Sequence, residues 1–76
     1  MDANSLTQRA ALNVWEEITQ AQETPASTAL ATGIPRSTLN RRLTGKSTFT
    51  VSEIELLAAH FGTTPVELLR AEVEAA

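Results

Sequence analysis

Residues 24–46 read TPASTALATGIPRSTLNRRLTGK, and this stretch decides the fold of the 76-residue chain. Thr24 followed by Pro25 is typical of a helix N-cap and first helical position, where a missing N–H costs nothing. Gly33 lies where the end of that helix needs a residue in the left-handed conformation. Gly45 closes a second short helical pattern in the same way. We therefore predict helices at residues 25–32 and 36–43, joined by a tight turn at Gly33-Ile34.

Capping residues and apolar spacing outside this stretch predict three further helices. Thr50 and Glu53 form a capping box, with Phe49 and Ile54 at the flanking staple positions, ahead of a helix at 51–61 that ends at Gly62. The first helix is expected at about residues 5–22, with Leu6, Ala10, Ala11, Val14, Trp15 and Ile18 at helical spacing. The stripe of the fourth helix is Val51, Ile54, Leu57, Ala58 and Phe61. Thr64 and Glu67 repeat the capping box and predict a fifth helix. Its apolar stripe is expected to be Val66, Leu69 and Val73, with Leu68 beside it, and its end is expected to fray at residues 72–76.

Composition limits the classes of protein to consider. The chain has no cysteine and one histidine, His60, so it has neither a disulfide framework nor the ligands for a Cys- or His-based metal site. No apolar run reaches the ~20 residues of a membrane span, and no signal-peptide core is seen. No strand-like alternation occurs. We expect one cytoplasmic all-α domain over residues 1–76, a compact bundle of about five helices, with no metal and no small-molecule cofactor.

Charge is unevenly distributed along the chain. The net charge is −3, which argues against a nucleic-acid partner. Residues 24–52, however, contain no acid and four bases, a local charge of +4, whereas the rest holds nine acids and two bases, a charge of −7. This distribution predicts one basic face on an acidic body. The acidic remainder would reduce indiscriminate binding to phosphate.

The second short helix, 36–43, has two chemically distinct faces. Leu39 and Leu43 lie on one face, beneath Ile34. The other face, by three- and four-residue spacing, carries Arg36, Ser37, Asn40, Arg41 and Thr44. Arginine pairs bidentately with guanine and asparagine with adenine, so this face suits the major groove. Two short helices in this arrangement form a helix-turn-helix over about residues 24–44.

At these residues the chain resembles the phage-repressor helix-turn-helix family, the Cro/Xre-type DNA-binding domains. The resemblance covers about residues 24–69. The matching positions are Ala29, Gly33-Ile34, Ser37-Thr38-Leu39, Arg41, Gly45-Lys46, Leu57, Ala58, Phe61-Gly62 and Leu68-Leu69. It implies a repressor-like fold whose third helix lies in the major groove, a phage or bacterial origin, and a homodimer on a near-palindromic site.

The resemblance also implies the roles of individual residues. The expected base contacts are Arg36, Ser37, Asn40 and Arg41, with Asn40 open between a base and a phosphate. The expected phosphate contacts are Thr24, Ser27, Arg42, Thr44 and Lys46. Two positions depart from the family pattern, because Thr28 and Arg42 stand where apolar residues are usual. For Arg42 the alternatives are a phosphate contact or an ion pair with an acid such as Glu17 or Glu23.

Two functions remain open, and neither is enzymatic. The neighbouring acids, such as Glu16 and Glu17, do not face each other on a helix, and no nucleophile–base set is present. The first function is sequence-specific binding of a double-stranded operator by a transcriptional regulator. The alternative is a protein-interaction module on the same scaffold, an antirepressor or antitoxin that uses its acidic terminal helices and Trp15. Trp15 is otherwise a core residue, and His60 a surface histidine at a helix end.

Overall fold

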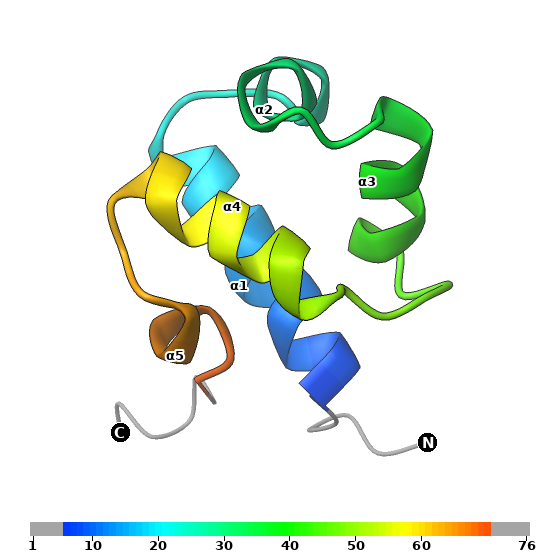
Figure 1. The fold of residues 1–76 in the computed structure, drawn as a ribbon, viewed down its shortest axis with the longest axis vertical. Coiled ribbons are helices and arrows are strands. Elements are labelled where there is room, and N and C mark those ends of the chain that lie inside the picture. The colour runs from blue at the N-terminus through cyan, green and yellow to red at the C-terminus, as the bar shows by residue number, and fades with distance from the viewer. Residues whose placement is uncertain (1–5, 71–76) are drawn as a thin grey trace.

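The computed structural model describes residues 6–70, which form five α-helices and contain no strand (Figure 1). The helices are α1 (Leu6–Gln20), α2 (Pro25–Thr32), α3 (Arg36–Leu43), α4 (Val51–Phe61) and α5 (Pro65–Leu68). The prediction of an all-α bundle of about five helices is confirmed. The bounds predicted for α2, α3 and α4 agree with the structure.

Local capping explains where the helices of the helix-turn-helix begin and end. Thr24 Oγ1 accepts a hydrogen bond from the Ser27 N–H at 3.1 Å, which starts α2. Gly33 ends α2 at φ 83°, with its N–H donating to the Ala29 carbonyl at 2.9 Å. A side chain at that left-handed φ would be strained, so glycine suits the turn. Helix α3 begins after Pro35 without a side-chain cap.

Apolar side chains from all five helices share one core. Val14 of α1, Leu39 of α3 and Leu57 of α4 are completely buried. Helix α3 packs against α2 and α1, while α4 packs against α2 and α5. Figure 1 shows α3 standing at one side of the bundle, so its outer face is open to solvent. The other buried members are Ala10, Ile18, Ala29, Ile34, Leu43, Phe49, Ile54, Ala58 and Leu68.

Helix α1 is shorter than predicted and carries an exposed tryptophan. It ends at Gln20 rather than at 22, because Gln22 takes a left-handed φ of 59° and the Glu23 N–H bonds back to the Ile18 carbonyl at 3.0 Å. Ser5, the predicted start, lies outside the described residues. Trp15 is 41% exposed and outside the core, so its assignment to the core was wrong. Leu6 was predicted to belong to the buried stripe of α1, but it is 56% exposed.

Three apolar residues of α4 and α5 differ from their predicted burial. Val51 and Val66 are exposed, because each lies in the first turn of its helix, at the edge of the bundle. Leu68, predicted to lie alongside the apolar stripe, is 1% exposed and belongs to the core. Helix α5 is a single turn. The predicted stripe residue Val73 and the frayed end at 72–76 lie outside the described residues.

Candidate nucleic-acid interface

The outer face of α3 has the composition predicted for it. Leu39 and Leu43 point into the core, and Thr38 is half-buried. This packing fixes the rotation of the helix about its axis. The exposed side chains on the opposite side are Arg36, Ser37, Asn40 and Arg41. Neither arginine pairs with an acid of the described residues, so both guanidinium groups are available to a ligand.

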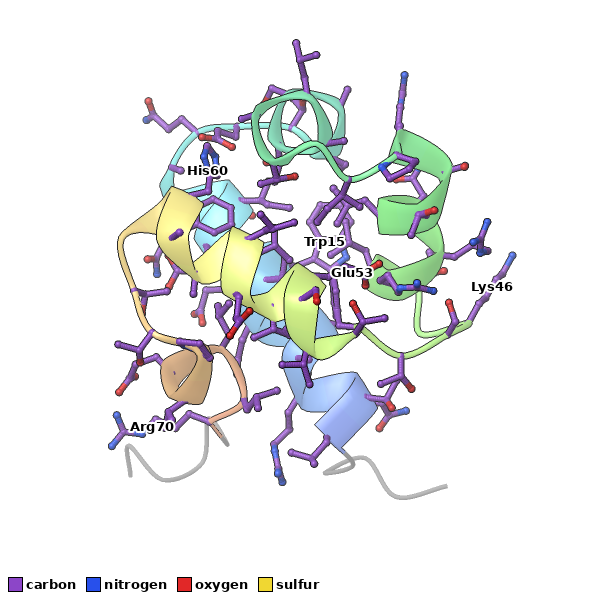
Figure 2. The ribbon with its side chains drawn as sticks, in the orientation of Figure 1. Trp15, Lys46, Glu53, His60 and Arg70 are labelled. Carbon is purple, nitrogen blue, oxygen red and sulfur yellow. The ribbon has the colours of Figure 1, made fainter. Side chains whose placement is uncertain are left out.

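The loop that follows α3 presents a lysine. Gly45 is left-handed at φ 80°, and the Lys46 N–H donates to the Arg41 carbonyl at 3.0 Å. The Lys46 side chain is exposed and extends away from the bundle just beyond the end of α3 (Figure 2). Thr44 Oγ1 donates to the Asn40 carbonyl at 3.0 Å, so its hydroxyl would have to turn to donate to a phosphate.

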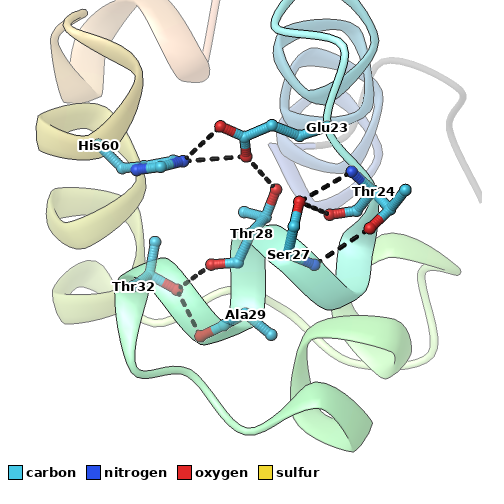
Figure 3. A network of polar contacts seen from close by, with 7 residues as sticks. All are labelled: Glu23, Thr24, Ser27, Thr28, Ala29, Thr32 and His60. Carbon is cyan, nitrogen blue, oxygen red and sulfur yellow. Dashed lines mark hydrogen bonds and ion pairs between the residues drawn. The ribbon is translucent and has the colours of Figure 1, made fainter.

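The first turn of α2 has little unused hydrogen-bonding capacity. The Ser27 hydroxyl accepts from the Thr24 N–H at 3.0 Å and donates to the Thr24 carbonyl at 3.1 Å, which completes a capping box (Figure 3). Pro25 has no N–H, and the Thr28 N–H bonds to Thr24 O. The Ala26 N–H and the Thr24 hydroxyl hydrogen are therefore the donors left for an anion. Ser27 contributes to such a site through the cap and not through a free hydroxyl hydrogen.

Arg42 forms an ion pair with an acid that the sequence analysis did not suggest. Its Nε and Nη2 donate to the two carboxylate oxygens of Glu53, at 2.9 and 3.1 Å. Its Nη1 donates to Ser47 Oγ at 2.6 Å. Of the two alternatives for Arg42, the structure has the ion pair, but with Glu53 in place of Glu17 or Glu23. A phosphate contact by Arg42 would have to displace this bidentate pair, so the structure argues against that prediction.

Glu53 serves two partners with one carboxylate. It accepts from the Thr50 N–H at 3.0 Å, and its own N–H donates to Thr50 Oγ1 at 3.1 Å, which confirms the predicted capping box. The hydrogen bond from Arg42, followed by that from the Thr50 backbone, lowers the pKa of Glu53 against the opposing effect of burial. Glu53 therefore stays ionised at neutral pH beside the loop that carries Lys46.

A second polar cluster joins α2 to α4. Thr28 is fully buried, and its hydroxyl donates to Glu23 Oε1 at 2.7 Å (Figure 3). His60 Nε2 lies 2.9 Å from Glu23 Oε2. The Thr28 hydroxyl, and after it His60, lowers the pKa of Glu23. His60 was predicted as a surface histidine but is partly buried, with 22% of its side chain exposed. The polar residue at position 28 was the only hint of this cluster in the sequence.

Other kinds of site find no support within residues 6–70. No group of three or more histidine, cysteine or acidic side chains there could hold a metal ion. No helix in that range is long and apolar enough to cross a membrane.

Comparison with known proteins gives one match. A helix-turn-helix family model matches residues 24–68, more than half of the chain. No curated protein and no solved structure matches. The matched range begins at the Thr24 cap and ends at the buried Leu68, so it includes the turn, α3, the Lys46 loop and α4. The family is a DNA-binding one and not enzymatic. The chain belongs to the Cro/Xre-type helix-turn-helix family of DNA-binding domains.

Proposed function

We propose that the chain is a sequence-specific transcriptional regulator of the repressor or Cro type, which reads double-stranded operator DNA with α3 in the major groove. The observation that carries this proposal is the outer face of α3, where exposed hydrogen-bonding side chains stand together with no acid among them. The base-reading residues are Arg36, Ser37, Asn40 and Arg41. Arginine selects guanine and asparagine selects adenine through their paired major-groove atoms.

Two segments on either side of this face hold the DNA backbone. One is the first turn of α2, where the Thr24 hydroxyl and the Ala26 N–H face an anion in the field of the helix N-terminus, with Ser27 holding the cap. The other is the loop after α3, with Lys46 as the cation and Thr44 beside it. Phosphate contacts of this kind set the register of the protein on the duplex, and the base contacts give specificity.

We further propose that two copies bind together. A domain of this size covers a small area of DNA, and one copy alone binds weakly. Two copies related by a twofold axis would place two α3 helices in successive major grooves, about one helical turn apart. The operator should accordingly be a near-palindrome.

Selection of bound sequences from random duplex DNA at physiological salt tests the proposal. We expect enrichment of a near-palindromic site. Arg41→Ala should weaken binding to that site by ~1–3 kcal/mol and relax the base preference at one position of each half-site. Arg70→Ala is the matched control, because Arg70 is an exposed arginine far from Lys46 at the α5 end of the bundle (Figure 2). Equal binding by wild type and Arg41→Ala would overturn the assignment of α3 as the reading helix.

The alternative of an interaction module rests on the outer surface of α1. Leu12 and Trp15 are 59% and 41% exposed and stand one helical turn apart. A tryptophan exposed in this way is common where proteins meet. If no duplex is enriched, while replacement of Trp15 by alanine abolishes binding to a partner protein, the antirepressor or antitoxin reading replaces the DNA-binding one. If the chain has both activities, the Trp15→Ala variant should no longer bind the partner protein but should still bind the selected duplex.

A further inference from the structure

The Arg42–Glu53 pair joins three consecutive parts of the chain. Arg42 lies in the last turn of α3, and Glu53 lies in the first turn of α4. Both side chains are 15% exposed, so the pair is largely shielded from water. Bidentate pairing of a guanidinium with a carboxylate fixes the relative orientation of the two groups as well as their distance. The end of the reading helix is thereby held against the start of α4.

The same two side chains hold the loop between these helices, residues 44–50. Arg42 Nη1 donates to Ser47 Oγ, the residue directly after Lys46, at 2.6 Å. Glu53 holds the other end of the loop through the capping box with Thr50. The Lys46 N–H is bonded to the carbonyl of Arg41. The backbone of Lys46 is thus fixed from both sides, although its side chain is exposed.

We infer that Arg42 and Glu53 are positioning residues, which set the place of Lys46 relative to the outer face of α3 without touching DNA. This inference rests on the proposed function. Its electrostatic part is that a lone carboxylate beside the loop would repel phosphate, whereas the paired carboxylate has its charge compensated by Arg42. The pair lets Glu53 serve as a helix cap close to the backbone-contacting loop.

The rival reading, in which Arg42 contacts a phosphate directly, makes opposite predictions. If Arg42 binds phosphate, Glu53→Gln releases the guanidinium and leaves binding equal or stronger. If Arg42 positions the loop, Glu53→Gln weakens binding. Arg42→Lys separates the two as well, because lysine keeps the charge but cannot form the bidentate pair. Arg42→Lys should retain full binding if Arg42 contacts phosphate, and should weaken binding, by no more than Lys46→Ala does, if Arg42 positions the loop.

The experiment measures binding of the selected duplex by wild type, Arg42→Met, Arg42→Lys, Glu53→Gln, Lys46→Ala and the Glu53→Gln/Lys46→Ala double variant, which leaves no unpaired carboxylate beside the loop. Glu53→Gln and Arg42→Lys should lose no more affinity than Lys46→Ala loses, because the contact at stake is that of Lys46. Arg42→Met should lose more, because it also leaves the Glu53 carboxylate unpaired beside the loop. The double variant should bind like Lys46→Ala alone, a non-additivity expected of residues that act through one contact. Additive losses in the double variant, or undiminished binding by Glu53→Gln, would overturn the inference.

The matched control is Glu67→Gln. Glu67 is the third residue of α5. Its Oε2 forms an ion pair with Arg70 Nη1 at 3.1 Å, and its N–H donates to Thr64 Oγ1. Its replacement removes the same charge from the start of another helix, away from the loop, where Thr64 caps the Glu67 N–H but no return hydrogen bond from the Thr64 N–H to the carboxylate is formed. Binding should not change. A loss by Glu67→Gln equal to that of Glu53→Gln would attribute the effect to net charge or folding, and so contradict the positioning role.

Amide hydrogen exchange of the DNA-free protein tests the positioning role of Arg42 and Glu53 separately from the proposed DNA-binding function. The amides of residues 44–50 that are protected in wild type should exchange faster in Glu53→Gln and Arg42→Met, and not in Glu67→Gln. Unchanged exchange in the loop would refute the positioning role even where wild type binds its selected duplex. Faster exchange together with failure of wild type to select any duplex would refute the proposed function and leave the ordering of the loop in place.

Discussion

Thr28→Val tests the polar cluster that joins α2 to α4. The two side chains have nearly the same shape, so the substitution removes the hydroxyl and little else. Thr28 is fully buried, and its hydroxyl donates at 2.7 Å to a carboxylate oxygen of Glu23. That carboxylate also meets His60, on α4. The variant therefore removes one link of the chain Thr28–Glu23–His60 and leaves the other in place.

The expected cost follows from two opposing effects. A hydrogen bond to a charged group contributes about 1.5–3 kcal/mol to stability. The methyl group that replaces the hydroxyl is better suited to a buried position and returns about 0.8 kcal/mol. The net loss in the free energy of unfolding is about 1–2 kcal/mol at pH 7. For a domain of this size each kcal/mol shifts Tm by roughly 4–8 °C, so the melting point should fall by about 5–15 °C.

The loss should depend on pH in a definite direction. The Thr28 hydroxyl is the largest cause of the lowered pKa of Glu23. A carboxylate whose pKa is lower in the folded than in the unfolded state stabilises the fold above its unfolded pKa, about 4.3 for glutamate. This contribution disappears as the pH falls through the folded pKa. The difference between wild type and Thr28→Val should therefore be full at pH 7 and shrink below about pH 4.

Urea denaturation followed by the fluorescence of Trp15, the single tryptophan, measures both effects. Thr32→Val is the control, because its hydroxyl lies on the same helix but donates to the carbonyl of Thr28 at 2.9 Å and touches no acid. It should cost about 0.5 kcal/mol or less, without pH dependence. If Thr28→Val costs no more than Thr32→Val at pH 7, or costs the same at pH 3 as at pH 7, the reasoning about the cluster is wrong.

Three further substitutions test the scaffold by urea denaturation. Gly33→Ala should lose about 1–2 kcal/mol, the penalty of a left-handed φ alone, because an added Cβ would meet nothing within 4 Å; a much larger loss would reveal a clash. Leu39→Ala empties a completely buried site and should lose about 2–5 kcal/mol, whereas a loss below 1 kcal/mol would mean that α3 is not packed as described. Asn13→Ala removes hydrogen bonds to the carbonyls of Leu68, at 2.8 Å, and Arg70, at 2.7 Å, and should cost about 1–2 kcal/mol with faster amide exchange in α5. Equal exchange in α5 would contradict it.

Sequence reasoning located the helices best where their ends are decided locally. The Thr50–Glu53 box and the glycines at 33 and 62 act on their immediate neighbours, so α2 and α4 could be bounded from a few adjacent residues. The end of α1 could not, because there a glutamine takes the left-handed conformation that glycine usually supplies. Helical spacing also failed for Val51 and Val66, because spacing gives the face of a helix but not how far the neighbouring elements cover its first turn.

The partners in the two ion pairs could not be predicted from the sequence for a related reason. Arg42 and Glu53 are 11 residues apart, and Glu23 and His60 are 37 apart. Which acid meets which base depends on how α4 lies against α2 and α3, and no local pattern records that arrangement. The sequence shows that Arg42 stands at a position where the family usually has an apolar residue. It could not choose Glu53 over Glu17 or Glu23.

The pairing of Arg42 changes the electrostatics of the proposed interface. The acid-free stretch holds four bases, but Glu53 compensates one of them. The exposed cations on the proposed DNA-facing side are then Arg36, Arg41 and Lys46. Of these three, Lys46 is the proposed phosphate contact, so Lys46→Ala should reduce the magnitude of the slope of log K against log[salt] by about 1 for each copy bound. The low net charge of the protein and a local positive face for DNA are compatible, because residues 24–52, which carry these three cations, contain no acid.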